Sequence, residues 1–260
     1  MSKPMLLADF VRLPPTVRGD VVEGLAAAID IVAERGAPSH RFLRFGWYAA
    51  ALTAYGGAAR TLVVEEDGTP VVTLPFVAYR PFGGQFGGQF GIVAIPGCRW
   101  PFRSLGVALG ASDAALRIAL VTLGGQVNGL RLGPICEGDA AATALIAVAR
   151  ALGWIVLDRP TGRGTPPTRP DDHVFWQAAV ADPVLADMIR TSGPTMDGAL
   201  GVAIDTGDGV YVASEDAPGQ SIRSLGHAPT RDWLLLRPGL PAIAGRMLGG
   251  FWQRSGRFDR

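Results

Sequence analysis

The chain has 260 residues and a net charge of +1; 18% of its residues are charged and 48% are hydrophobic. This length suffices for one large domain or two small lobes with a real core, and the hydrophobic content excludes a disordered chain. The nearly neutral charge gives no electrostatic reason to expect a nucleic-acid partner. Lys3 is the only lysine among 24 basic residues, which together with many alanines, glycines and prolines is typical of a GC-rich bacterial genome.

The two cysteines, Cys98 and Cys136, are far apart and form no C-x-x-C pair, which favours reduced thiols in a cytoplasmic protein. Asp9 and Pro14 interrupt an N-terminal apolar run that is too short for a signal peptide. No segment approaches the ~18–20 apolar residues of a membrane-spanning helix. We therefore expect a cytoplasmic protein.

The first part of the chain begins with two expected helices. Asp20 is a candidate N-cap for a helix that ends at Gly36. Ser39 is a candidate N-cap for a second helix, rich in aromatic residues, that ends at Gly56.

A hairpin is expected over residues 60–79, with its turn at Asp67-Gly68. Ser112 and Asp139 are candidate N-caps of two later helices, and residues 130–135 and 154–158 have the pattern of strands. This alternation predicts an α+β (α/β-like) lobe over residues 1–159.

Residues 82–91 form a tandem repeat, FGGQFGGQFG. Its glycines permit a flexible lid, in which Gln85 and Gln89 would be the groups to test, or a hairpin tip whose phenylalanines rest on the core. The second, structural interpretation is favoured.

Residues 160–172 are rich in proline and arginine and are expected to form a linker to a C-terminal lobe over residues 173–260. The linker region overlaps an R-x-x-G-x-G pattern that starts at Arg159, as in acyl-CoA pyrophosphate loops, but Pro166 and Pro167 forbid the helix that should follow. Beyond the linker we expect a helix interrupted at Asp182-Pro183, a hairpin over 198–214, a strand over 232–236 and a last helix over 241–254.

The segment that most resembles a ligand site is the strand 209–214 followed by Ala217-Pro218-Gly219 and a helix-like stretch. The first N–H groups of a helix lack partners, and the helix dipole is positive there, so such a turn suits a phosphate. Physical chemistry alone thus predicts an anion site.

Other chemistries find less support. His40, His173 and His227 lack metal-ligand spacing, so no metal site is expected, and each is interpreted as a surface or capping residue. No G-x-S-x-G sequence indicates a hydrolase. The C-terminal segment is basic and could touch an anionic membrane surface weakly, although surface arginines around a docked helix are the favoured explanation. Its arginines are residues 223, 231, 237, 246, 254, 257 and 260.

The first part of the chain contains four segments that belong together: residues 39–75, VAIPGCRWPFRSLG, LRLGPI and LIAVARALGWIVLDR. Together they resemble the first lobe of GNAT-superfamily acyltransferases, in the cellulose-biosynthesis or Fem-like acetyltransferase branch. Residues 172–190, the strand GVYVAS and RDWLLLRPGLPAIAGRM are similar to pieces of the second lobe of that family. The resemblance implies a mixed sheet flanked by helices, with a complete first lobe. Because typical members are longer after the first lobe and after Ala217-Pro218-Gly219, the second lobe is expected to be shortened.

The resemblance implies transfer of an acyl group from acetyl-CoA or another acyl-CoA to an amine or hydroxyl of a small molecule or saccharide precursor. The edge of the strand containing Val210 and Val212 would pair with the pantetheine arm. Residues 210–214 would splay from the neighbouring strand and leave the V-shaped opening that this arm requires. Tyr211 would be the proton donor, with a core-facing aromatic as the alternative. The pyrophosphate would be bound by three backbone N–H groups and one arginine, those of Gly219, Gln220, Ser221 and Arg223.

Two alternatives stay open. A shortened second lobe favours a catalytically inactive GNAT-like binding or scaffold protein. The basic tail weakly favours a component peripheral to polysaccharide assembly at a membrane. The sequence predicts neither the acceptor nor the oligomeric state.

Overall fold

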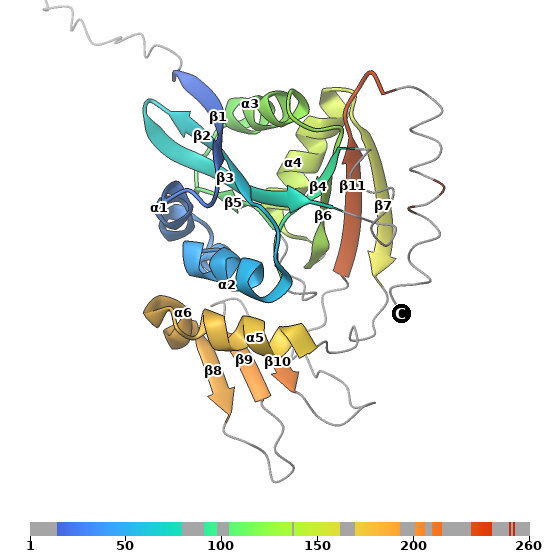
Figure 1. Cartoon of the computed structure of the whole chain (residues 1–260). Coiled ribbons are helices and arrows are strands. Elements are labelled where there is room, and N and C mark those ends of the chain that lie inside the picture. The colour runs from blue at the N-terminus through green and yellow to red at the C-terminus, as the bar shows by residue number, and fades with distance from the viewer. Residues whose placement is uncertain are drawn as a thin grey trace, which may run out of the picture.

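The computed structural model describes residues 15–79, 91–97, 104–136, 138–161, 170–192, 201–205, 210–214, 230–240, 250 and 252. Its main body is a mixed eight-stranded sheet with helices packed on it (Figure 1). The strands follow the order β1-β2-β3-β4-β6-β11-β7, and β5 pairs with β3. They are β1 (Val17–Glu23), β2 (Arg60–Glu66), β3 (Thr69–Ala78), β4 (Ile92–Ala94), β5 (Gly106–Val107), β6 (Gly129–Cys136), β7 (Ile155–Thr161) and β11 (Thr230–Leu236).

Helices α3 and α4 pack against each other on the larger sheet, and α1 and α2 lie toward its other side (Figure 1). A smaller antiparallel sheet has the order β10-β9-β8. The remaining bounds are α1 (Ala28–Arg35), η1 (Pro38–His40), α2 (Phe45–Tyr55), α3 (Asp113–Gly124), α4 (Ala140–Ala151), α5 (Pro170–Ala179), α6 (Pro183–Met188), β8 (Ile189–Ser192), β9 (Gly201–Asp205) and β10 (Val210–Ser214). The mixed sheet flanked by helices agrees with the predicted fold class.

Several local predictions are confirmed. Asp67 and Gly68 have φ of 50° and 77° in the turn between β2 and β3, as a tight hairpin turn requires. The side chains of Ser112 and Asp139 accept hydrogen bonds from the backbone at the starts of α3 and α4. The interruption predicted at Asp182-Pro183 falls between α5 and α6, where the Asp182 side chain accepts from the backbone at the start of α6. These features depend on a few consecutive residues, which explains why the pattern sufficed.

The first predicted helix is partly wrong. Asp20 lies in β1, which pairs with β2 at every position, and α1 begins only at Ala28. The apolar residues of 17–23 fit a half-buried strand as well as a helix, and pairing with β2 decides between the two. Gly36 follows the end of α1, as predicted.

The cap of the second helix was also assigned incorrectly. Ser39 lies within the short 3-10 helix η1, and α2 begins at Phe45. The Phe45 N–H donates to Asp30 Oδ1 at 2.8 Å, so a side chain of α1 supplies the acceptor. A cap that comes from a neighbouring helix has no signature in the local sequence.

The strand predicted at 232–236 forms as β11, but in the larger sheet, where it lies antiparallel between β6 and β7. The C-terminal part of the chain therefore completes the sheet that the N-terminal part begins. The ends of the predicted linker also differ, because β7 continues to Thr161 and α5 already begins at Pro170. Residues 162–169 lie outside the described part, as does most of the FGGQ repeat.

An aromatic cluster joins α2 to α5. The Trp47 ring lies edge-on to those of Phe42 and Phe175, with centroids 4.9 and 4.8 Å away. Trp176 lies 5.9 Å from Trp47, and Tyr55 stacks on Phe175 at 6.0 Å. Trp47 and Phe175 are almost fully buried, so this contact is continuous with the core of the larger sheet.

Candidate functional site

The strand over residues 209–214, whose edge was predicted to pair with the pantetheine arm, forms as β10. It lies at the edge of the smaller sheet. Val210, Tyr211 and Val212 pair with Asp205, Ile204 and Ala203 of β9. Among the described strands, β10 has no neighbour on its other side. An open strand edge presents unpaired backbone N–H and C=O groups to an extended ligand.

The predicted pyrophosphate residues Gly219, Gln220, Ser221 and Arg223 lie outside the described residues. Their role therefore stays a prediction. The next described strand along the chain is β11, which belongs to the larger sheet.

The V-shaped opening was expected beside β10. Strands β10 and β9 stay paired along the whole of β10, so they do not diverge from each other. In the larger sheet, β4 and β6 run parallel and pair only from Ile92–Gly129 to Ala94–Arg131. Beyond that point β6 continues to Cys136 without β4 as its partner.

The helices α3 and α4 of the larger sheet have N-termini that are already occupied. At α3, Glu66 Oε1 accepts from the Ser112 N–H at 3.1 Å and from the Ser112 hydroxyl, while Ser112 Oγ accepts from the Ala115 N–H at 3.2 Å. At α4, Asp139 Oδ1 accepts from the Ala142 N–H at 2.7 Å. A carboxylate at each position neutralises the positive end of the dipole and repels a second anion. Neither end is an open phosphate site.

Asp139 has a second partner that sequence reasoning missed. Its Oδ2 lies 2.7 Å from His40 Nε2, and both side chains are about nine-tenths buried. His40, which was predicted to be a surface or capping residue, is therefore buried against the N-cap residue of α4. The two residues are 99 positions apart, and no sequence signal joins them.

The surroundings of this pair are electrostatically unusual. Burial favours the neutral acid at Asp139, but the hydrogen bond and charge of His40, with the Ala142 N–H, outweigh it and lower the pKa of Asp139 below its usual 3.8. Burial, and secondarily the charge of Asp139, raise the pKa of the Tyr48 phenol far above its usual value. The Tyr48 hydroxyl donates to the Ser104 carbonyl at 3.2 Å. Tyr48 is thus a neutral donor, and Asp139 is ionised at neutral pH.

A second buried charge cluster is centred on Asp232 of β11. Asp232 Oδ2 accepts from Arg131 Nη2 at 2.8 Å and from Arg159 Nη2 at 2.9 Å. The Arg159 guanidinium lies 4.1 Å from the Trp252 ring centroid and donates to the Trp252 carbonyl at 3.2 Å. Arg131 also donates to the Tyr79 hydroxyl at 2.8 Å. Arg159, where the R-x-x-G-x-G pattern starts, therefore lies in β7 and belongs to these ion pairs.

Two arginines of the basic C-terminal segment also have partners. Arg231 Nη1 lies 3.0 Å from Asp158 Oδ2, and Arg237 Nε donates to Asn128 Oδ1 at 2.8 Å. The arginines at 223, 246, 254, 257 and 260 lie outside the described residues, as do the side chains of His173 and His227.

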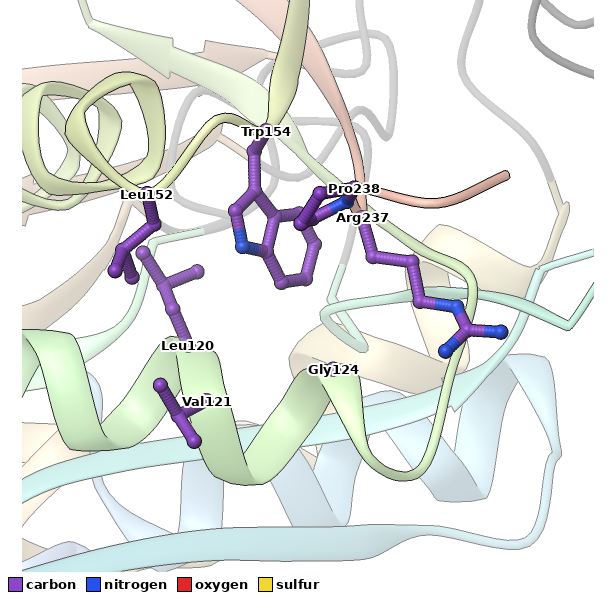
Figure 2. Close-up of a pocket in the computed structure, with 7 residues that line it drawn as sticks. All are labelled: Leu120, Val121, Gly124, Leu152, Trp154, Arg237 and Pro238. Carbon is purple, nitrogen blue, oxygen red and sulfur yellow. The ribbon is translucent and has the colours of Figure 1, made fainter. Parts of the chain in front are cut away.

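A surface pocket of about 240 Å³ lies between α3 and the chain that follows β11 (Figure 2). The Trp154 ring stands at its centre, and Val121 of α3 also lines the pocket. The other lining residues are Leu120, Gly124, Leu152, Arg237 and Pro238. None of them is a predicted site residue, and the walls are apolar apart from Arg237.

Within the part of the chain that the structure describes, no group of three or more His, Cys, Asp or Glu residues is placed to hold a metal ion. Over the same residues, no helix is long and apolar enough to cross a membrane.

No protein-family model matches the chain, and no curated protein matches it. Among solved structures, it is similar to a tandem GNAT protein from the clavulanic acid biosynthesis pathway, determined without AcCoA. The identity is 11% and the TM-score 0.27, over 93% of this chain and 87% of that one. A likeness at this level carries no argument about the site, so the fold class rests on the sheets described above.

Proposed function

We propose that the chain is a GNAT-like acyltransferase that transfers an acyl group from acyl-CoA to the amine or hydroxyl of a small molecule or saccharide precursor. The observation that carries this proposal is the placement of β10. It is an edge strand in the described structure, and Ala217-Pro218-Gly219 follow it closely in the sequence. An amide-containing chain such as pantetheine can add to an open strand edge through backbone hydrogen bonds.

The occupied helix ends of the larger sheet support the same location. Glu66 and Asp139 fill the N-termini of α3 and α4, so a pyrophosphate would meet negative charge there. In this proposal the segment after β10 would bind the pyrophosphate through the backbone N–H groups of Gly219, Gln220 and Ser221, with Arg223 as a cation.

The proposed chemistry is direct attack of the acceptor amine or hydroxyl on the thioester carbonyl. The bond from acyl carbon to acceptor forms, and the carbon–sulfur bond breaks. Tyr211 would protonate the departing thiolate, and the proton that the acceptor loses would return the tyrosine to its neutral form. Positioning of the two substrates supplies most of the rate in such a reaction.

A catalytically inactive GNAT-like binding protein is the second candidate. Two observations favour it: β9 and β10 stay paired along all of β10, and the strand that follows lies in the other sheet. A pantetheine arm would then have only one strand edge to pair with.

Thermal unfolding with and without acetyl-CoA tests both candidates. Ligand at 100 times its dissociation constant should add about 2.7 kcal/mol to the free energy of unfolding. Arg223→Ala should weaken binding about tenfold, through loss of one charged hydrogen bond, whereas Arg260→Ala serves as the matched control.

Release of free thiol in the presence of amine and hydroxyl acceptors separates the two candidates. Binding with thiol release that Tyr211→Phe abolishes supports the transferase. Binding without thiol release supports the inactive protein. Absence of any stabilisation by millimolar acetyl-CoA contradicts both.

A further inference from the structure

Strand β1 forms one border of the larger sheet (Figure 1). It pairs with β2 at all its residues, and no other described strand lies beside it. A strand edge of this kind can pair with a second strand through the backbone, and proteins commonly blunt such edges with charge.

Two hydrogen bonds show which backbone groups are already used. The Asp67 N–H donates to the Thr16 carbonyl and the Gly24 N–H donates to the Ala59 carbonyl, each at 2.9 Å. Both pairs continue the β1–β2 register, and hydrogen-bonded residues alternate along an antiparallel strand. The even-numbered residues of β1 therefore bond to β2. The N–H and C=O groups that face the open edge belong to Val17, Gly19, Val21 and Glu23.

The two faces of β1 differ. Val17 and Val21 pack against the core, and Gly19 lies directly under α3, where a Cβ atom would come within 2.6 Å of Thr122 Oγ1. Arg18 and Asp20 point to the opposite, exposed face, where Arg18 Nε lies 2.7 Å from Asp20 Oδ2.

We propose that β1 pairs antiparallel with β1 of a second copy of this chain, with the two-fold axis at Gly19. Such pairing must place odd-numbered residues opposite odd-numbered ones, because these carry the free backbone groups. With the axis at Gly19, Val17 faces Val21 of the second copy, and Arg18 faces its Asp20. The two copies thereby form one continuous sheet.

The charges select this register. An axis at Arg18 would place two arginines face to face, and an axis at Asp20 would do the same with two carboxylates. An axis at Val21 would leave Asp20 opposite an apolar Val22. Among these four axes, only the axis at Gly19 places an arginine of each copy opposite an aspartate of the other. Arg18 and Asp20 also occupy positions that make no hydrogen bonds across the interface, where side chains approach most closely.

Analytical ultracentrifugation of the full chain tests the pairing. We expect the wild type to show reversible association from the 27.3 kDa monomer to twice that mass. Arg18→Asp alone should sediment as a monomer, because carboxylates would then face carboxylates, and Asp20→Arg alone should do so because arginines would face arginines. Circular dichroism and thermal unfolding show that each variant is folded.

Mixing the two single variants supplies the sharpest control. One copy then carries only carboxylates at both positions and the other only guanidinium groups, so the mixture should recover the dimer that neither variant forms alone. The Arg18→Asp/Asp20→Arg double variant should dimerise as well. A strictly monomeric wild type, or a dimer that persists in both single variants, would overturn the proposal.

Discussion

Replacement of Asp232 by asparagine should destabilise the protein far more than its small size change suggests. The residue is fully buried in β11, and its carboxylate binds Arg131 of β6 and Arg159 of β7. Asparagine keeps the shape of the side chain, but it removes the charge and replaces one acceptor oxygen with an NH2 donor. The substitution therefore tests the polar interactions of the cluster without creating a cavity.

The magnitude follows from the burial of all three groups. Side-chain exposure is 1% for Asp232, 11% for Arg131 and 9% for Arg159. Removing one partner of a buried ion pair costs about 3–5 kcal/mol, because the remaining charge stays in a medium of low dielectric constant. For a chain of this size that is a fall in Tm on the order of 10 °C.

Urea unfolding followed by tryptophan fluorescence measures this cost, and Asp158→Asn is the matched control. Asp158 on β7 pairs with Arg231, and the side chains of the two residues are 53% and 34% exposed. Loss of this ion pair should therefore cost only about 0–1 kcal/mol. If both variants unfold within about 1 kcal/mol of the wild type, then the Asp232 cluster does not hold β11 in the sheet.

Three further predictions concern named contacts. Asp139→Asn keeps the helix cap but loses the carboxylate that contacts His40. Because the pKa of Asp139 is lowered in the folded state, its contribution is present well above pH 3.8 and is lost as the pH falls through the lowered folded-state pKa, so urea midpoints of variant and wild type should converge in acid. Ser112→Ala should cost about 1 kcal/mol through loss of the α3 cap, whereas Ser39→Ala should stay within about 0.5 kcal/mol; equal losses would contradict the assigned caps. Phe175→Ala should cost about 3–5 kcal/mol by opening the aromatic cluster, and a smaller loss than about 1 kcal/mol would show that α5 does not dock on α2.

Features built from neighbouring residues followed from the sequence. The Asp67-Gly68 turn and the Ser112 and Asp139 caps appear where they were expected. Each depends on backbone preferences and hydrogen bonds that span only a few residues, so the information is local. The antiparallel pair of β9 and β10 was also predicted correctly, because the alternating pattern of each strand is local.

Features that join distant residues depended on the tertiary structure. The segment that begins at Val17 became a strand because β2 supplies its hydrogen-bond partners. His40 meets Asp139, and Asp232 meets two arginines about 70 and 100 positions away, only after the sheet has formed. Buried charges need oppositely charged or hydrogen-bonding partners, but no spacing pattern in the sequence predicts which distant residues these will be.

The sequence by itself thus determined the Asp67-Gly68 turn, the caps at Ser112 and Asp139, and most helices and strands, and it predicted an anion site after β10. The tertiary structure decided that β11 closes the larger sheet, that the ends of α3 and α4 are occupied by carboxylates, and that β1 borders the sheet. The physical reason is the distance along the sequence over which each interaction acts. Adjacent residues specify the hydrogen bonds within a turn or cap. Strand order and buried ion pairs depend instead on which distant segments can supply one another's backbone hydrogen bonds and opposite charges.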